Sequence, residues 1–175
     1  SGSADVLGNI GALASVTRVT ADKRIRIYPV PSFTVGYLSF NQRDPANLEE
    51  PHPILSDPAV RAAIVKALDR RAVVQATFGP WAAVPEGPVP QLSWIRDPSF
   101  RPAPADVAGA RALLRAHGWV DSDGDGVLDK GGKPFVLGLN YPSQSSTAGQ
   151  MALQVQEQLR QLGIRIDINR LDAPV

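Results

Sequence analysis

The pattern of hydrophobic and polar residues predicts three amphipathic helices, the clearest of them over 57–79. Asp57 is a favourable N-cap, and Pro58 follows at a position where its missing N–H costs nothing. An apolar stripe then repeats at helical spacing and ends at Gly79. It consists of Val60, Ile64, Ala67, Leu68, Val74 and Phe78. We therefore expect one continuous helix.

The two other helices are predicted at about 105–117 and 147–162. Each is followed by a glycine suited to ending a helix, Gly118 and Gly163. Their inward-facing residues are Val107, Ala110, Leu113, Leu114, Met151, Val155, Leu159 and Leu162.

The last of these helices lies between two predicted strands. An apolar strand over 135–140 precedes it, and after it Ile164, Ile166 and Ile168 alternate with polar residues. A strand, a helix and a strand within about 35 residues have the length of a right-handed βαβ unit with parallel strands. The predicted fold class is therefore α/β, with a βαβ unit at about 135–169.

The rest of the chain has weaker patterns. Short strands are predicted at 4–8 and 24–30, with a helical stretch to about Thr20 between them. The segment 33–40 is apolar on both faces, which predicts a strand covered on two sides. The following NQRDPANLEEPHPIL segment is predicted to be a loop or an extended arm, because it contains three prolines.

The segment from Pro80 to Pro104 contains seven prolines. Their fixed φ angles and missing N–H donors predict an irregular segment. Its scattered apolar residues are expected to hold it against a surface of the protein. These residues are Trp81, Leu92, Trp94, Ile95 and Phe100.

Composition narrows the possible partners and sites. The chain has 175 residues and a formal net charge of +1, which gives no electrostatic footprint for nucleic acid or an anionic membrane. It has no cysteine, which excludes thiol catalysis, disulfides and thiolate metal sites. No apolar run approaches the roughly 20 residues that cross a bilayer. We interpret Ser1 to Ser3 as a cloning remnant and expect any export signal to lie outside this chain.

Catalytic motifs are missing from the sequence. It has no G-x-S-x-G elbow, no H-E-x-x-H motif and no glycine-rich phosphate loop. His52 and His117 are expected to be structural or surface residues. We therefore predict that the protein is not an enzyme.

The carboxyl ends of the two parallel strands mark the candidate binding site, because ligands of open α/β sheets bind there. Two polar segments are expected to meet at this edge, 141–147 at a helix N-terminus and 171–175 after the second strand. The candidate ligand-binding residues are Tyr141, Gln144, Ser145, Ser146, Thr147 and Asp172. The alternative is an ordinary Ser/Thr N-cap with a connecting loop.

The segment DSDGDGVLDKGG begins like a calcium-binding loop. Asp121, Asp123 and Asp125 stand at loop positions 1, 3 and 5, and Gly126 stands at position 6. Position 12, normally a bidentate glutamate, is Gly132. The sequence thus leaves calcium as the only candidate cofactor, with a structural turn as the alternative. Trp119, just before the loop, is expected to pack beneath it.

Several motifs in order resemble one protein family. They are YLSFN (37–41), SDPAVRAAIVKALDR (56–70), EGPVP (86–90), ARALLRAHGWVDSDGDGVLDKGGKPF (110–135) and QEQLRQLGIRIDI (156–168). Together they resemble the C-terminal lobe of the family 5 extracellular solute-binding proteins, the dipeptide and oligopeptide receptors of ABC importers.

The resemblance implies one lobe of a type II periplasmic-binding-protein fold, a mixed sheet flanked by helices. It implies that the lobe, over 25–175 and incomplete at its C-terminal end, closes with a missing first lobe over a peptide or other small solute. Residues 1–24 would then be the cloning remnant and a junction between the lobes. The other implied partner is the ABC permease, and the implied location is periplasmic or extracytoplasmic, with lipid anchoring open.

The resemblance also changes two site expectations. Dipeptide receptors of the family place an Arg and a Tyr in the loop at 141–147, whereas this loop carries no cation; a longer peptide or a neutral solute is therefore favoured. In the same family the D-G-D-G segment is a turn followed by a short hairpin. This favours the structural turn over the calcium site and over the alternative function, a calcium-stabilised extracytoplasmic binding module.

Overall fold

The computed structural model describes residues 5–8, 10, 13–97 and 99–172. The elements between the N-terminus and the middle of the chain are α1 (Leu13–Thr20), β1 (Arg43–Asp44), β2 (Asn47–Pro51), α2 (Pro58–Ala67), α3 (Arg70–Phe78) and the 3-10 helix η1 (Gly79–Trp81). Those of the second half are α4 (Val107–Ala116), β3 (Asp129–Lys130), β4 (Lys133–Pro134), β5 (Val136–Pro142), α5 (Ser146–Gln161) and β6 (Arg165–Leu171). No helix among the described residues is long and apolar enough to span a membrane.

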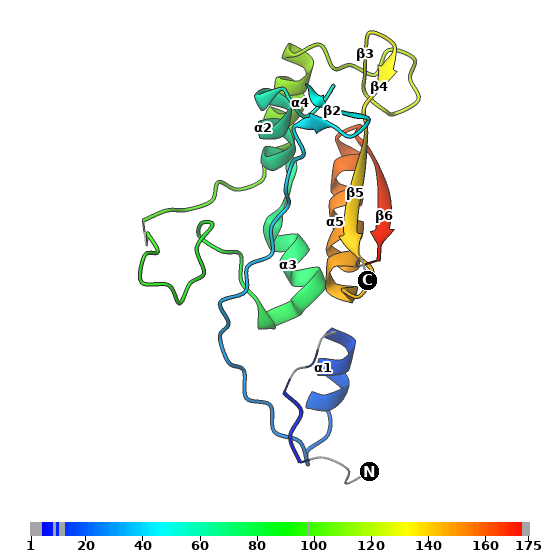
Figure 1. Cartoon of the computed structure of the whole chain (residues 1–175). Coiled ribbons are helices and arrows are strands. Elements are labelled where there is room, and N and C mark those ends of the chain that lie inside the picture. Colours follow the sequence, from blue (N-terminus) through cyan, green and yellow to red (C-terminus); the bar gives the residue numbers. More distant parts are fainter. Residues whose placement is uncertain (1–4, 9, 11–12, 98, 173–175) are drawn as a thin grey trace.

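The predicted βαβ unit is confirmed. β5 and β6 pair in parallel along their full length, from Val136 opposite Arg165 to Pro142 opposite Leu171. The helix α5 connects them and lies along the sheet (Figure 1). Leu137 and Ile166, paired across the two strands, are both buried, because the alternating apolar residues of both strands face the core.

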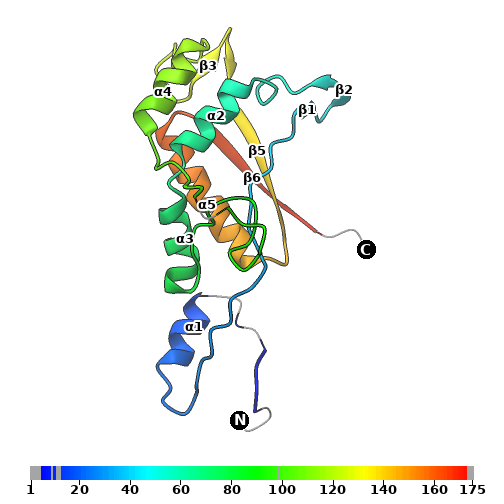
Figure 2. The same ribbon diagram turned by 90° about the vertical axis from the view of Figure 1, so that its left-hand side faces the viewer.

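The core lies where α2, α4 and α5 meet the β5–β6 sheet. α2 and α4 pack side by side, as Figures 1 and 2 show. The Trp119 and Phe135 rings pack against each other at a tilt of 39° with centroids 4.4 Å apart, and Phe135 is 0% exposed. The burial predicted for Trp119 is thus confirmed. The largest fully buried side chains are Phe135, Ile64, Leu114, Leu159, Leu162, Ile164, Val60 and Thr77.

The prediction of one helix over 57–79 is wrong, because the chain breaks into α2 and α3. Leu68 adopts an extended conformation (φ −78°, ψ 117°), and Asp69 caps α3 by accepting hydrogen bonds from the N–H groups of Arg71 and Ala72. On α5, the Gln158 side chain accepts from Asp69 N–H at 2.7 Å and donates to Asp69 O at 3.3 Å. Gln158 therefore satisfies backbone groups that the break would otherwise leave unpaired.

The predicted strands of the N-terminal part are wrong as well. Residues 5–8, 24–30 and 33–40 form no strand, although the helix prediction before Thr20 is confirmed by α1. Tyr28 is 75% exposed and Tyr37 86% exposed, and neither segment has a neighbouring strand among the described residues. A strand requires a partner for its N–H and C=O groups, and no described strand pairs with 33–40. Residue 4, the first of the 4–8 prediction, lies outside the described residues.

Two loop predictions need correction. The segment after residue 41 contains the hairpin β1–β2 rather than an irregular arm throughout. The proline-rich segment 80–104 is irregular beyond η1, as predicted, but its apolar side chains do not hold it against the protein: Trp94 is 94% exposed.

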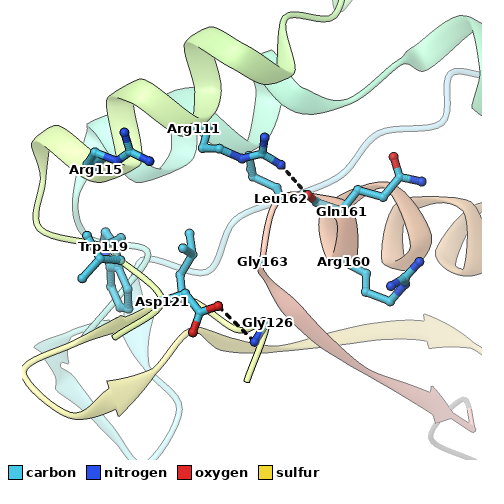
Figure 3. A pocket seen from close by; sticks show the side chains of 11 residues that line it. Arg111, Arg115, Trp119, Asp121, Gly126, Arg160, Gln161, Leu162 and Gly163 are labelled. Carbon is cyan, nitrogen blue, oxygen red and sulfur yellow. Dashed lines mark hydrogen bonds between the residues drawn. The ribbon is translucent and has the colours of Figure 1, made fainter. Parts of the chain in front are cut away.

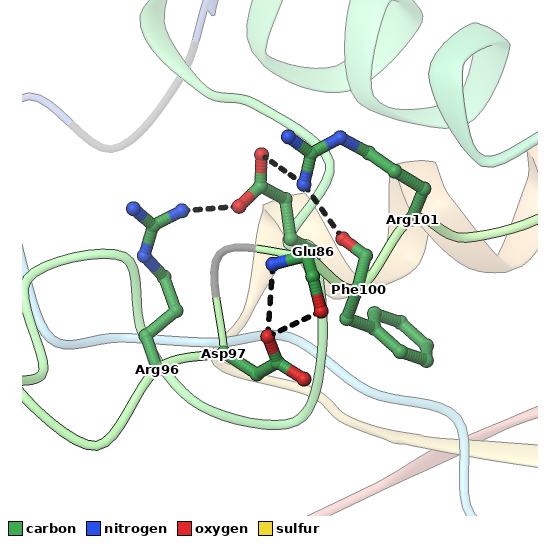
Figure 4. A network of polar contacts seen from close by, with 6 residues as sticks. Glu86, Arg96, Asp97, Phe100 and Arg101 are labelled. Carbon is green, nitrogen blue, oxygen red and sulfur yellow. Dashed lines mark hydrogen bonds and ion pairs between the residues drawn. The ribbon is translucent and has the colours of Figure 1, made fainter.

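Polar contacts stabilise the proline-rich segment instead. The Glu86 carboxylate forms ion pairs with Arg96 and Arg101 (Figure 4). The Asp97 carboxylate accepts hydrogen bonds from the backbone N–H and the hydroxyl of Ser99. These contacts join its two halves within the same segment, so its apolar residues stay on the surface.

Candidate functional site

The two polar segments predicted at one edge of the sheet do lie side by side. Tyr141 is paired with Arg170 and Pro142 with Leu171, and Ser143 N–H continues the ladder to Leu171 O at 2.8 Å. Both strands end there, next to the first turn of α5 (Figure 1). Asp172 follows directly and is exposed, whereas residues 173–175 of the predicted segment lie outside the described residues.

Some of the predicted ligand-binding residues hold the helix start in place. Ser145 is the N-cap of α5, and its Oγ accepts from Ala148 N–H at 3.1 Å and lies 3.2 Å from Thr147 Oγ1. This is the N-cap that the sequence left as the alternative. Gln144, Ser146 and Asp172 are exposed, so their side chains are accessible to a ligand.

Tyr141 packs against the first helical turn. A Cβ added at Gly149 would come within 3.1 Å of the Tyr141 ring, so a larger residue at 149 would displace the ring. Gly149 was not among the residues predicted for the site. The signal was a glycine in the first turn of a helix, where it costs helix propensity and needs a packing reason.

Arg170 was not predicted for the site either. The loop 141–147 has no cation, but the parallel register places this arginine beside Tyr141. Arg170 continues the alternation of Ile166 and Ile168 and thus lies on the sheet face that α5 covers, just beyond the helix start. It is exposed there, and a cation near free N–H groups of a helix N-terminus suits a carboxylate.

The aspartate segment forms the predicted turn and hairpin. Asp121 accepts hydrogen bonds from the N–H groups of Gly124 (2.8 Å) and Gly126 (3.1 Å), and β3–β4 follows as the hairpin. Gly124 and Gly126 have φ angles of 77° and 87°, which favour glycine. Asp123 and Asp125 make the same kind of side-chain-to-backbone contact with the residues two positions on.

The same segment offers one group of potential metal ligands. Carboxylate oxygens of Asp121, Asp123 and Asp125 lie within 4.8 Å of one another. Asp129, the remaining carboxylate of the segment, faces Ser122: the hydroxyl and the backbone N–H of Ser122 lower the pKa of its carboxyl group. Three exposed carboxylates already bonded to backbone N–H groups fall short of the six or more oxygens that calcium takes.

We predict that the chain binds no calcium in the low millimolar range. Isothermal titration at pH 7 should show no saturable heat, and Asp123→Ala should behave like the unchanged chain. A saturable signal in the unchanged chain that Asp123→Ala removes would contradict the prediction and establish the segment as a calcium site.

Both histidines have structural roles, as predicted. His52 Nδ1 accepts from the N–H groups of Ile54 and Leu55 at 3.0 Å, and His117 Nδ1 lies 3.0 Å from Asp57 Oδ2. Although burial raises the pKa of Asp57, the N–H of Ala59 and the His117 ring outweigh this effect and leave the pKa below its ordinary value. These contacts fix the start of α2 and the end of α4.

Fold and site together define the class of protein: an α/β lobe of the type II periplasmic-binding-protein kind. A family model described as "Bacterial extracellular solute-binding proteins, family 5 Middle" matches residues 1–174. The chain belongs to this family of solute-binding proteins. Its placement in the C-terminal lobe stays a prediction.

Several members of the family are similar to the chain. The oligopeptide-binding protein AppA of Bacillus subtilis is 35% identical over 157 residues, which cover 84% of this chain and 26% of AppA. The glutathione-binding protein GsiB of Salmonella choleraesuis is 30% identical over 153 residues, 87% of this chain and 26% of GsiB. The chain thus spans about a quarter of the length of these relatives.

Solved structures of the family share the fold. AppA in complex with a nonapeptide superposes on 68% of this chain and 24% of AppA with a TM-score of 0.59 and 33% identity. The binding protein MelB of Agrobacterium fabrum in complex with stachyose superposes on 69% of this chain and 19% of MelB with a TM-score of 0.63 and 28% identity.

Proposed function

We propose that this chain is one lobe of the substrate-binding component of an ABC-type importer. The lobe captures a peptide or related solute between itself and a first lobe that this chain does not contain, and the complete receptor delivers the solute to the permease. It works outside the cytoplasm, in the periplasm or at the cell surface. The lobe comprises residues 25–175, and residues 1–24 hold the cloning remnant and the junction between the lobes.

One observation carries the proposal. In a chain that belongs to the solute-binding family, the edge formed by Tyr141, Arg170 and Asp172 lies open beside the N-terminus of α5. This is the edge at which open α/β sheets bind ligands. The exposed side chains at this edge carry a guanidinium (Arg170), a carboxylate (Asp172), a hydroxyl (Ser146) and an amide (Gln144). These groups match the charged termini and the backbone of a peptide.

Arg170 narrows the solute class. A guanidinium next to a helix N-terminus favours a solute with a free carboxylate, and peptides carry one. The position of Arg170 on β6 differs from the loop cation that the family resemblance implies for dipeptide receptors. We therefore favour peptides longer than two residues, of the kind in the AppA complex with a nonapeptide.

The proposal is tested with the full-length receptor that contains this lobe. Thermal unfolding should be measured with peptides of two to nine residues, glutathione and stachyose. At ligand concentrations of about 100 times Kd, binding to the folded state adds about 2.7 kcal/mol to stability, so at least one peptide should raise the Tm clearly. No stabilisation by any of these solutes would overturn the proposal.

The role of Arg170 has its own control. Arg170→Gln should weaken binding of a peptide with a free C-terminus by about tenfold, the loss expected for one charge-assisted contact. It should leave binding of the same peptide with an amidated C-terminus unchanged. Equal losses for both peptides would show that Arg170 does not contact the carboxylate.

A further inference from the structure

A second site lies at the opposite end of the βαβ unit. A cavity of about 360 Å³ opens between the C-terminal half of α4 and the last turn of α5. Arginines 111, 115 and 160 line it together with Asp121 and Gly126 of the aspartate turn, and Trp119, Leu128 and Leu162 are its apolar lining residues (Figure 3). We name this cavity the arginine groove.

The arginines of the groove hold unused hydrogen-bond donors. Arg111 uses one nitrogen, Nη2, to donate to Gln161 O at 2.7 Å. Arg160 uses Nε and Nη2 for Glu157, which leaves Nη1. Arg115 makes no hydrogen bond or ion pair with any residue that the structure describes. Because Arg111 and Arg115 are four residues apart, they share one face of α4, as Figure 3 shows.

The acceptors next to these donors are already in use. Both carboxylate oxygens of Asp121 accept N–H groups of its own turn, from Gly124 and Gly126. Glu157 accepts from Arg160 and from Gln161. The residues that line the groove include three arginines and one carboxylate, Asp121, a net charge of +2; Glu157, Asp123 and Asp125 lie outside the lining. The unused guanidinium donors of the lining therefore favour a ligand that accepts hydrogen bonds and carries negative charge.

We propose that the arginine groove binds the phosphate group of a small anionic ligand. A phosphate monoester presents three acceptor oxygens with a charge of about −1.5 to −2 at neutral pH, so it can accept from guanidinium groups that approach from two helices. A planar carboxylate is matched by a single guanidinium fork and would leave the other arginines without a partner. The cavity volume of about 360 Å³ has room for a ligand larger than inorganic phosphate, and the apolar lining residues can contact its non-phosphate part.

The arginine groove is separate from the proposed solute site. The groove lies at the C-terminus of α5, and Ser145 and Tyr141 lie at the other end of the same 16-residue helix. At about 1.5 Å per residue, this helix holds the two sites about 24 Å apart. A ligand in the groove therefore does not compete with the solute, and failure of either proposal leaves the other untouched.

Arg115→Gln tests the groove without disturbing the fold, because Arg115 is exposed and makes no contact that its loss would break. Titration of the 175-residue chain with inorganic phosphate and with glycerol phosphate at low salt should give saturable binding. Arg115→Gln should weaken it by about five- to tenfold, the effect of one lost charge-assisted contact. Arg115→Lys keeps the positive charge but loses the planar guanidinium group. Its affinity for phosphate should lie between those of the unchanged chain and Arg115→Gln.

Arg71→Gln is the matched control. Arg71 is also an exposed helical arginine without a side-chain partner among the described residues, and it does not line the groove. This variant should bind phosphate like the unchanged chain. Equal weakening by Arg71→Gln and Arg115→Gln would overturn the proposal, because it would show attraction to overall charge.

Two further binding measurements, with lipid vesicles and with an acidic peptide, identify the source of the phosphate. Binding to vesicles that contain phosphatidic acid but not to phosphatidylcholine vesicles, lost in Arg115→Gln, would assign the groove to a lipid headgroup. Phosphate binding without vesicle binding would assign it to a soluble ligand. Binding of a polyglutamate peptide with no binding of either phosphate source would overturn the proposal in favour of an acidic protein segment, and binding of none of these probes would also overturn it.

Discussion

Replacement of Phe135 by alanine is expected to lower the free energy of unfolding by about 3–5 kcal/mol, the range for truncating a buried phenylalanine. Phe135 is fully buried, and its ring packs on Trp119. Its backbone joins two parts of the fold, since Phe135 N–H donates to Leu128 O and Phe135 O accepts from Arg165 N–H. Alanine keeps these backbone bonds but leaves a cavity between the aspartate turn and the sheet.

Urea unfolding followed by tryptophan fluorescence measures this loss, because Trp119 reports on the same contact. Phe100→Ala is the matched control: Phe100 is half exposed in the proline-rich segment, and its removal should change stability by no more than about 0.5 kcal/mol. Equal destabilisation by the two substitutions would mean that Phe135 does not fill the core as described.

The second large effect is expected in solute binding and rests on the proposed function. A peptide that the full-length receptor binds with a Kd of about 1 μM should bind this chain alone with a Kd of about 1 mM or weaker, a loss of about 1,000-fold. The reason is that one lobe supplies roughly half of the contacts, and halving the binding free energy converts a micromolar Kd into a millimolar one. Enclosure of the solute by hinge closure also requires both lobes.

Isothermal titration of both proteins with the same peptide measures this difference. Circular dichroism should first show that the isolated chain is folded, so that weak binding is not a folding defect. Restoring the first lobe as a separate chain should recover part of the affinity. Micromolar binding by the isolated chain would contradict the two-lobe arrangement and place the whole site on this lobe.

The elements that the sequence predicted well depend on neighbouring residues. Asp57 and Ser145 cap the helices that follow them, and Gly118 and Gly163 adopt the positive φ angles, 83° and 88°, that the predicted helix ends need. A cap or a glycine turn involves groups within a few positions of one another, so its signal is contained in a short stretch of sequence. The aspartate turn was also predicted correctly, because its side-chain-to-backbone hydrogen bonds join residues only two to five positions apart.

The errors concern groups that meet only in the folded chain. The break between α2 and α3 is supported by Gln158, which lies 89 residues from Asp69. The spacing of apolar residues is compatible with one continuous helix as well as with two, because the apolar stripe continues through the break. Likewise, the apolar residues of 33–40 predict a strand, but whether the segment becomes one depends on a partner strand that it cannot specify alone.

The residues of the candidate site likewise fall into those that the local sequence predicted and those that only the folded chain brings together. The sequence by itself determined the α/β class, the βαβ unit and the edge at which the segments around Tyr141 and Asp172 meet, because residue periodicity and element length encode local conformation and its order. Only the tertiary structure decided that Arg170 joins this edge and that arginines from α4 and α5 share a groove. Strand register and helix packing bring these side chains together, and both are set by contacts between residues far apart in the chain.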